Sequence, residues 1–271
     1  PDANSITYVG GSFSKVGALT RNNAAAFDSS GNITSWNPNV NGDVKALAVS
    51  GTSVYIGGAF SGTNSINGNT TRNAVAKVDT TNGTVDTSWN ADLHKGTPCP
   101  PGIPPYWCSI YGLGESSPEI RAIAVAGSSV YLGGLFDKVN GSAARKNVAK
   151  VSATDGTVDS SFNLTLASGF TRTDVNAIAV SGQDVYIGGN FSVQVTGSTR
   201  PLIVKYNNST GALNESWAPD LRTSYDNEVK SIAVDATKVY LGGFFSTGYS
   251  AAKVNAASGT VDGSWVPMRS S

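Results

Sequence analysis

The side chains best suited to chemistry lie in one stretch of the chain, residues 91–119. This stretch holds His94, the single histidine, with Asp92 and Glu115 nearby. A histidine next to a carboxylate can activate a serine as a nucleophile, so a hydrolase site is one interpretation. No G-x-S-x-G elbow accompanies these residues, and one histidine cannot form a metal site by itself. We therefore expect His94 to be a surface-loop residue and expect neither cofactor nor metal, with a hydrolase as the alternative.

The same stretch is rich in proline and carries both cysteines and several aromatic residues. Cys99 and Cys108 lie close together, which favours a local disulfide and an oxidising compartment. Tyr106, Trp107 and Tyr111 would then be displayed on a rigid projection. Rigid aromatic side chains supply contact area at low entropic cost, so we predict that they bind a ligand. The alternative is that they fold down onto a neighbouring part of the domain.

Basic residues recur at matching positions and form a second group of candidates. Four arginines take part: Arg21, Arg72, Arg145 and Arg200. Of these, Arg72, Arg145 and Arg200 are candidate ligand-binding residues for anionic sugars, and the alternative is that their guanidinium groups donate to loop carbonyls. Four lysines also recur, and we expect their stems to lie on the sheets and their ammonium groups to reach solvent: Lys77, Lys150, Lys205 and Lys253.

A repeated element must position these residues. An apolar run ending in a glycine pair occurs five times, as TYVGGSF, SVYIGGAF, SVYLGGLF, DVYIGGNF and KVYLGGFF. Repeats of about 50 residues are typical of propeller blades. A phosphate-binding glycine loop would be followed by a helix, whereas another strand follows here. We therefore expect the glycines to bend the strand end and to let a neighbouring aromatic residue approach the backbone.

Each repeat predicts four antiparallel strands. In the second copy these are residues 44–49, 53–58, 74–79 and 83–89. The connections after the first and third strands are short and uniform, and the other two vary in length. Since alternate connections leave an antiparallel sheet at opposite edges, every long loop is expected on one face. One aromatic residue follows each repeat and is expected to pack between blades, with a carbohydrate platform as the alternative: Trp36, Trp89, Phe162, Trp217 and Trp265.

The repeat pattern, with VYxGGxF, RN, AKVD and GTVDxSWN in this order, resembles the delta-60 repeat and is also kelch-like. The resemblance covers essentially the whole chain in five copies. It implies a β-propeller of the kind found in bacterial surface and secreted proteins. It implies no catalytic residues, because the residues shared within the family belong to the scaffold.

We therefore expect an all-β fold in which residues 1–271 form a single β-propeller domain of five four-stranded blades. The first blade lacks its inner strand, and we favour a ring that closes with five blades over membership of a larger ring. The expected segments are blade 1 at 5–37, blade 2 at 43–90, an insertion at 91–119, blade 3 at 120–163, blade 4 at 174–218 and blade 5 at 228–266.

Composition limits the function classes. The chain has 19 basic and 19 acidic residues, which removes the electrostatic case for binding nucleic acid or an anionic membrane surface. No apolar stretch is long enough to span a membrane, and the first residues do not have the pattern of a signal peptide. The resemblance implies an exported protein, outside the cell or on its surface.

The function that we expect is noncatalytic recognition or cell adhesion. The long-loop face would bind a glycan or a surface protein of another cell. The alternatives are a propeller-fold hydrolase or lyase that acts on glycans, and a purely structural module of a larger oligomeric fibre.

Overall fold

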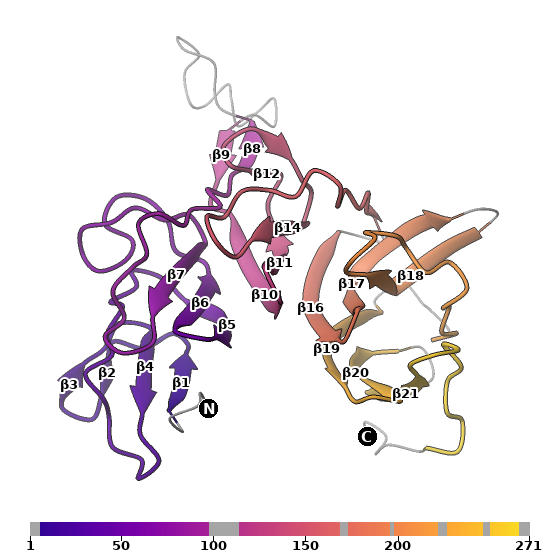
Figure 1. Ribbon diagram of the computed structural model, residues 1–271, viewed down its shortest axis with the longest axis horizontal. Helices are drawn as coiled ribbons and strands as arrows, with labels where there is room; N and C mark the ends of the chain where they lie inside the picture. The colour runs from indigo at the N-terminus through magenta and orange to yellow at the C-terminus, as the bar shows by residue number, and fades with distance from the viewer. Residues whose placement is uncertain are drawn as a thin grey trace.

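The computed structural model describes residues 6–97, 114–168, 173–195, 198–221, 227–245 and 250–265. Within these ranges all regular structure is β-strand, which confirms the all-β prediction. No helix in the described ranges is long and apolar enough to cross a membrane. The sheets follow one another along an arc, from indigo at the N-terminus to yellow at the C-terminus (Figure 1).

Five repeating units make up the arc in the described part of the chain, and each has a middle strand that carries the glycine pair. The middle strands of units 1 to 5 are β1 (Thr7–Gly10), β6 (Ser53–Gly58), β11 (Ser129–Leu135), β17 (Asp184–Val195) and β20 (Lys238–Phe244). The third strands are β4 (Ala24–Phe27), β7 (Val75–Asp79), β14 (Val148–Ser152), β18 (Ser198–Asn207) and β21 (Ala251–Asn255). All these pairs are antiparallel.

Units 2 to 5 also have an inner strand. These strands are β5 (Val44–Ser50), β10 (Glu119–Ala126), β16 (Asp174–Ser181) and β19 (Glu228–Val234). Each inner strand contacts the inner strand of the next unit, so they lie on the inside of the arc (Figure 1). In the described residues of unit 1, β1 pairs with β4 alone, as expected from the absence of an inner-strand sequence.

The predicted fourth strand is wrong. In each unit this segment makes one isolated bridge to the third strand, as between Val78 and Val85 in unit 2. The bond from the backbone N–H of Asp86 to the carbonyl of Lys77 belongs to this bridge, and the chain then turns away, because the carboxylate of Asp86 accepts from the backbone N–H of Ser88 at 3.0 Å. The aspartate turn therefore ends the pairing before a strand can form.

The glycine pair has a scaffold role in the interface between units. Opposite the pair, the inner and middle strands shift register in units 2 to 5. A Cβ on Gly58 would lie 2.9 Å from the carbonyl carbon of Asp43, so the second glycine permits this close approach. A Cβ on Gly57 would lie 2.8 Å from the Cδ1 atom of Ile123 in unit 3. The side chain that approaches the first glycine is thus aliphatic, not aromatic as expected.

The core lies between units rather than inside them. The described residues form four apolar clusters, and each joins two successive units. In the cluster between units 2 and 3, Tyr55 and Trp89 come from one unit, and Val130 and Leu132 come from the next. A single unit is therefore too thin to bury its own apolar residues, and each depends on its neighbour.

Short and long connections leave the units on opposite sides. The turn after an inner strand contacts the turn after the third strand, since the N–H of Thr80 donates to the carbonyl of Thr52 at 3.0 Å. We name this side the tight-turn side and the other the long-loop side. The remaining short strands belong to connections: β2 (Lys15–Val16), β3 (Leu19–Thr20), β8 (Lys95–Thr97), β9 (Gly114–Ser116), β12 (Lys138–Val139), β13 (Ala143–Ala144) and β15 (Ala167–Ser168).

Candidate functional site

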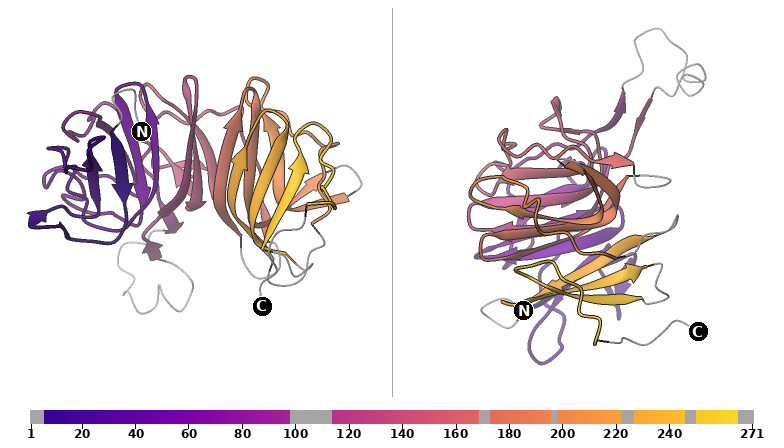
Figure 2. Two further views of the ribbon diagram at one scale, coloured as in Figure 1. Left: turned by 90° about the horizontal axis from the view of Figure 1, so that it is seen from below. Right: turned by 90° about the vertical axis from the view of Figure 1, so that its right-hand side faces the viewer.

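The insertion after unit 2 begins and ends as a two-stranded ribbon. β8 and β9 pair antiparallel, with Lys95 opposite Ser116. The ribbon extends beyond the other strands on one side of the arc (Figure 2). Its base is attached to unit 3, because the N–H of His94 donates to the carbonyl of Lys138 at 3.1 Å and the N–H of Gly96 donates to Oδ2 of Asp137 at 2.8 Å. The described part of the insertion is therefore a fixed projection.

A small polar cavity of about 260 Å³ lies at the base of this ribbon, on the long-loop side. Hydroxyl, amide, imidazole and ammonium groups contribute to its wall, and Leu93 and Pro118 supply apolar surface. The polar lining residues are Ser61, Asn73, His94, Lys95, Ser116 and Ser117. The Oγ atoms of Ser61 and Ser117 lie 3.2 Å apart. This set can donate and accept several hydrogen bonds at short range.

Two larger hollows, of about 410 and 380 Å³, lie on the tight-turn side of units 2 and 3. They are lined by equivalent residues in the two units, Asp86 in one and Asp159 in the other. Because the same hollow occurs in both units, we attribute it to the turn geometry that the units share. The cavity at the ribbon combines Ser61 and Asn73 of unit 2 with residues of the insertion, which occurs only once, and we therefore take it as the candidate site.

His94 meets Asp92 at the edge of this cavity. The Nε2 atom of His94 lies 3.2 Å from Oδ1 of Asp92, and the same oxygen accepts from the side-chain amide of Asn73 at 3.3 Å. The carboxylate thus orients both the imidazole and the amide. No cluster of three or more metal-ligating side chains occurs among the residues that the structure describes.

The recurring arginines hydrogen-bond to loops of their own units. Arg72 is buried, and its Nη2 atom donates to the carbonyls of Asp86 and Thr87 at 3.1 and 3.2 Å. Arg145 makes the same pair of contacts with Asp159 and Ser160. Burial lowers the pKa of Arg72, although the negative charges of Asp86 and Asp92 act to raise it. These contacts agree with the alternative interpretation, in which the guanidinium groups donate to loop carbonyls.

Arg200 and Arg21 follow the same pattern. The Nη2 atom of Arg200 donates to the carbonyl of Glu215 at 3.1 Å, and that of Arg21 donates to the carbonyl of Thr34 at 2.9 Å. Ligand binding by Arg72, Arg145 and Arg200 stays a prediction. A ligand would have to compete with these backbone carbonyls for the guanidinium groups.

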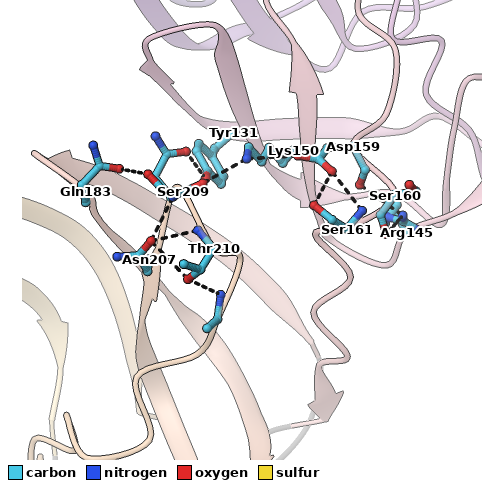
Figure 3. Close-up of polar contacts among 12 residues, drawn as sticks. Tyr131, Arg145, Lys150, Asp159, Ser160, Ser161, Gln183, Asn207, Ser209 and Thr210 are labelled. Carbon is cyan, nitrogen blue, oxygen red and sulfur yellow. Dashed lines mark hydrogen bonds and ion pairs between the residues drawn. The ribbon is translucent and has the colours of Figure 1, made fainter.

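Lys77, Lys150 and Lys205 link neighbouring units, so the expectation that these three reach solvent is wrong. Lys253 of unit 5 pairs with Asp262 of its own unit. The Nζ atom of Lys150 lies 3.0 Å from Oδ2 of Asp159 in its own unit and donates to the carbonyl of Asn208 in the next at 3.1 Å. Figure 3 shows Lys150 between Asp159 and the turn that contains Ser209 and Thr210. The hydroxyl of Tyr131 donates to Oδ1 of Asn208 in the same turn at 2.7 Å.

A row of charged residues crosses the inner strands of units 2 to 5. Glu119 lies 3.1 Å from Lys45 and 2.5 Å from Arg121, and Nη1 of Arg121 lies 3.3 Å from Oδ2 of Asp174. Burial opposes ionisation of Glu119, but hydrogen bonds from Arg121 and Lys45 outweigh it and lower the pKa of this carboxyl. The row therefore joins successive units with groups of opposite charge.

The row continues into unit 5. The amide of Asn176 donates to Oε2 of Glu228 at 3.2 Å, and Glu228 lies 3.2 Å from Nζ of Lys230. Sequence reasoning missed this row. The signal was present, because Lys45, Arg121, Asn176 and Lys230 all occupy the same position of the inner-strand pattern.

Several predicted site residues lie outside the described residues. These are the ligand-binding candidates Tyr106, Trp107 and Tyr111 and the predicted disulfide partners Cys99 and Cys108. Glu115 lies in β9, and its backbone pairs with Gly96. The predictions for the five unplaced residues therefore stay predictions.

Comparison with known proteins agrees with the repeat architecture. Residues 125–162 match a family described as "Domain of unknown function (DUF5122) beta-propeller". This range lies in unit 3 and includes β11 and β14. No curated protein matches the chain. Among solved structures the chain is similar to the computationally designed Ika4 protein, with 17% identity, a TM-score of 0.42 and coverage of 75% of this chain and 86% of that chain.

Proposed function

We propose that this chain is a noncatalytic recognition domain, a propeller domain with five blades of the delta-60 or kelch-like kind in a bacterial extracellular or cell-surface protein. It binds a glycan or a protein through its long-loop side. The observation that supports this most is the polar cavity at the base of the β8–β9 ribbon. The ribbon is attached to unit 3, so the cavity has a preformed wall and binding requires little ordering of the chain.

The size and lining of the cavity suit a small polar group. Its volume of about 260 Å³ is just below the range of about 300–1,000 Å³ that is usual for ligand pockets. One sugar ring or one amino-acid side chain fits this scale better than an extended ligand. The hydroxyls of Ser61 and Ser117 and the ammonium of Lys95 would hydrogen-bond to sugar hydroxyls or to a carboxylate.

Binding to a glycan array tests the proposal. The wild type, Ser117→Val and Trp107→Ala are compared, with Ser128→Val as the control because Ser128 is an exposed serine on the tight-turn side. We expect the control to bind as the wild type does and Ser117→Val to lose most of its signal. Equal binding by all four proteins would remove the cavity and the insertion from the site.

A hydrolase or lyase remains the alternative function, and the Asp92–His94 contact is the feature that would serve it. The array ligands, incubated with the protein, would then release reducing ends in a manner that depends on His94. Release by the wild type and its loss in His94→Ala would replace the recognition proposal with catalysis.

A further inference from the structure

The four interfaces inside the chain are built alike: a tyrosine and an aromatic residue of one unit face the next unit in all four, and a lysine joins them in units 2 to 4. Between units 2 and 3, the Nε1 atom of Trp89 donates to the carbonyl of Ser152 at 2.9 Å. The hydroxyl of Tyr55 and the ammonium of Lys77 both donate to the carbonyl of Ala153, each at 3.2 Å. We call the side of a unit with the tyrosine, the following aromatic and the lysine its trailing face. The opposite side, with apolar residues of the middle strand and these turn carbonyls, is the leading face.

The trailing face of unit 5 is only partly covered. Its aromatic pair is Tyr240 and Trp265, whose ring centroids lie 6.2 Å apart. Both side chains are half-buried. The residues of units 1 to 4 that are equivalent to Trp265 are almost completely buried. Their exposed fractions are 1%, 0%, 1% and 2% at Trp36, Trp89, Phe162 and Trp217. The difference arises because each of those residues is covered by the next unit.

The leading face of unit 1 is uncovered in the same way. Val9 is 38% exposed, whereas the equivalent residues Ile56, Leu132, Ile187 and Leu241 are 0%, 0%, 0% and 2% exposed. Thr7 is exposed at a position where units 2 to 5 have a buried valine. The carbonyls of Asp28 and Ser29 lie at the end of β4 as those of Asp79 and Thr80 lie at the end of β7, and the carbonyl of Thr80 accepts from Tyr8 of the preceding unit.

We propose that the trailing face of unit 5 binds the leading face of unit 1 in a second copy of this chain. The two faces are the two halves of an interface that already occurs four times within one chain, so the aromatic residues of one and the backbone acceptors of the other match by type. Trp265 and Tyr240 pack on Val9, and Trp265 and Lys253 donate to the carbonyls of Asp28 and Ser29. Units 1 and 5 form the two ends of the arc (Figure 1).

This association is weaker than the contacts inside the chain. In an internal interface the inner strand places aliphatic side chains against the first glycine of the pair, as Val175 and Ile178 do at Gly133. At Gly242, an added Cβ would meet only Ser231 of the same unit. In the described residues unit 1 has no inner strand to fill this position, so the contact between copies rests on the aromatic residues and the lysine. It is head-to-tail and can extend beyond two copies.

Sedimentation velocity across a range of protein concentrations tests the inference. Val9→Asp places a charge on one face, and Trp265→Ala truncates the anchor of the other. Each change is expected to weaken self-association by about tenfold or more, because buried aromatic anchors and unpaired charges dominate such contacts. Val49→Asp is the matched control, since Val49 is a 39% exposed strand valine of unit 2. Far-UV circular dichroism and thermal unfolding confirm that each variant is folded.

Mixing the two variants separates this interface from any other. A Val9→Asp copy keeps an intact unit 5 and a Trp265→Ala copy keeps an intact unit 1, so we expect the mixture to form dimers that go no further. A wild type that stays monomeric at all concentrations would overturn the inference, as would closure of units 1 and 5 within one chain. Variants that associate like the wild type, or a mixture that stays monomeric, would overturn it equally.

Discussion

The Nζ atom of Lys205 lies 2.7 Å from Oδ2 of Asp184, at the start of the middle strand of unit 4. The equivalent lysines of units 2, 3 and 5 pair instead with an aspartate that directly follows the isolated bridge to the third strand. In unit 4 the residue at the position of this aspartate is Asn214. The carboxylate occurs instead at residue 184, where units 2 and 3 have serine. Each unit with the lysine thus keeps one carboxylate beside it, although its place in the chain differs.

Asp184→Asn is expected to destabilise the chain by about 1 to 3 kcal/mol, because the buried ammonium of Lys205 loses its charged partner. Urea unfolding measures the loss. Adding Asn214→Asp restores the arrangement of the other units, so the double variant is expected to regain most of the stability. Failure of this rescue would show that the lysine does not require a carboxylate at either position.

Gly133→Ala is expected to destabilise the chain by about 1 to 3 kcal/mol, as added atoms in a packed core do. The new Cβ would lie 2.5 Å from Cγ1 of Val175 and 3.0 Å from Cδ1 of Ile178, both in the next unit. Gly263→Ala is the control, since a Cβ there meets nothing within 4 Å. Thermal unfolding of the two variants compares them, and equal melting temperatures would contradict the close contact between units 3 and 4.

The free energy of unfolding is expected to fall in acid, partly because of Asp159. Hydrogen bonds from Ser161 and Lys150 lower the pKa of Asp159 from 3.8 to about 2, against the opposing effect of burial. The unfolded chain therefore takes up a proton first, and this stabilisation is present above pH 3.8 and is lost as the pH falls toward about 2.

Denaturant unfolding at several pH values measures this slope in the wild type and in Asp159→Asn. The variant is expected to show a shallower decline over the same interval. Some decline remains, because the pKa values of Asp86 and Asp262 are also lowered. Identical slopes in the two proteins would mean that Asp159 titrates alike in the folded and unfolded states.

Buried tyrosines are expected to limit stability in alkali. Burial raises the pKa of Tyr131, Tyr186 and Tyr206 to about 12, from an ordinary value of 10.0. Their contribution to stability is complete below pH 10.0 and is lost as the pH rises toward about 12, since the unfolded chain ionises first. Absorbance at the phenolate band should show a late titrating group that Tyr131→Phe, Tyr186→Phe and Tyr206→Phe each reduce. If all tyrosines of the folded protein ionised near pH 10, the burial of these three side chains would be contradicted.

The strands were predictable where their signal is local. Residues 53–58 form the middle strand of unit 2 as predicted, because an alternating apolar run bounded by turns indicates a strand directly. Residues 83–89 were also predicted as a strand, but their pairing ends at one bridge. Whether a β-prone run pairs further depends on the turn at Asp86, whose hydrogen bonds the run itself does not reveal.

The site was less predictable, because it depends on contacts between units. Lys77 resembles a solvated surface residue in the sequence, yet it reaches Asp86 at 3.0 Å and a carbonyl of unit 3. Pairing with a residue 76 positions away has no local signature. The insertion was recognisable as the part that does not repeat, whereas the cavity at its base depends on Ser61 and Asn73 from another loop.

The placement of the apolar clusters between units has a consequence for how such a chain can change in length. Every interface runs in the same direction, from the tyrosine and aromatic of one unit to the middle strand of the next. A gene duplication that inserts one whole unit would therefore add one interface and alter none of the existing ones. The architecture allows growth and shrinkage by whole repeats without compensating substitutions, whereas loss of half a repeat would leave two surfaces that do not match.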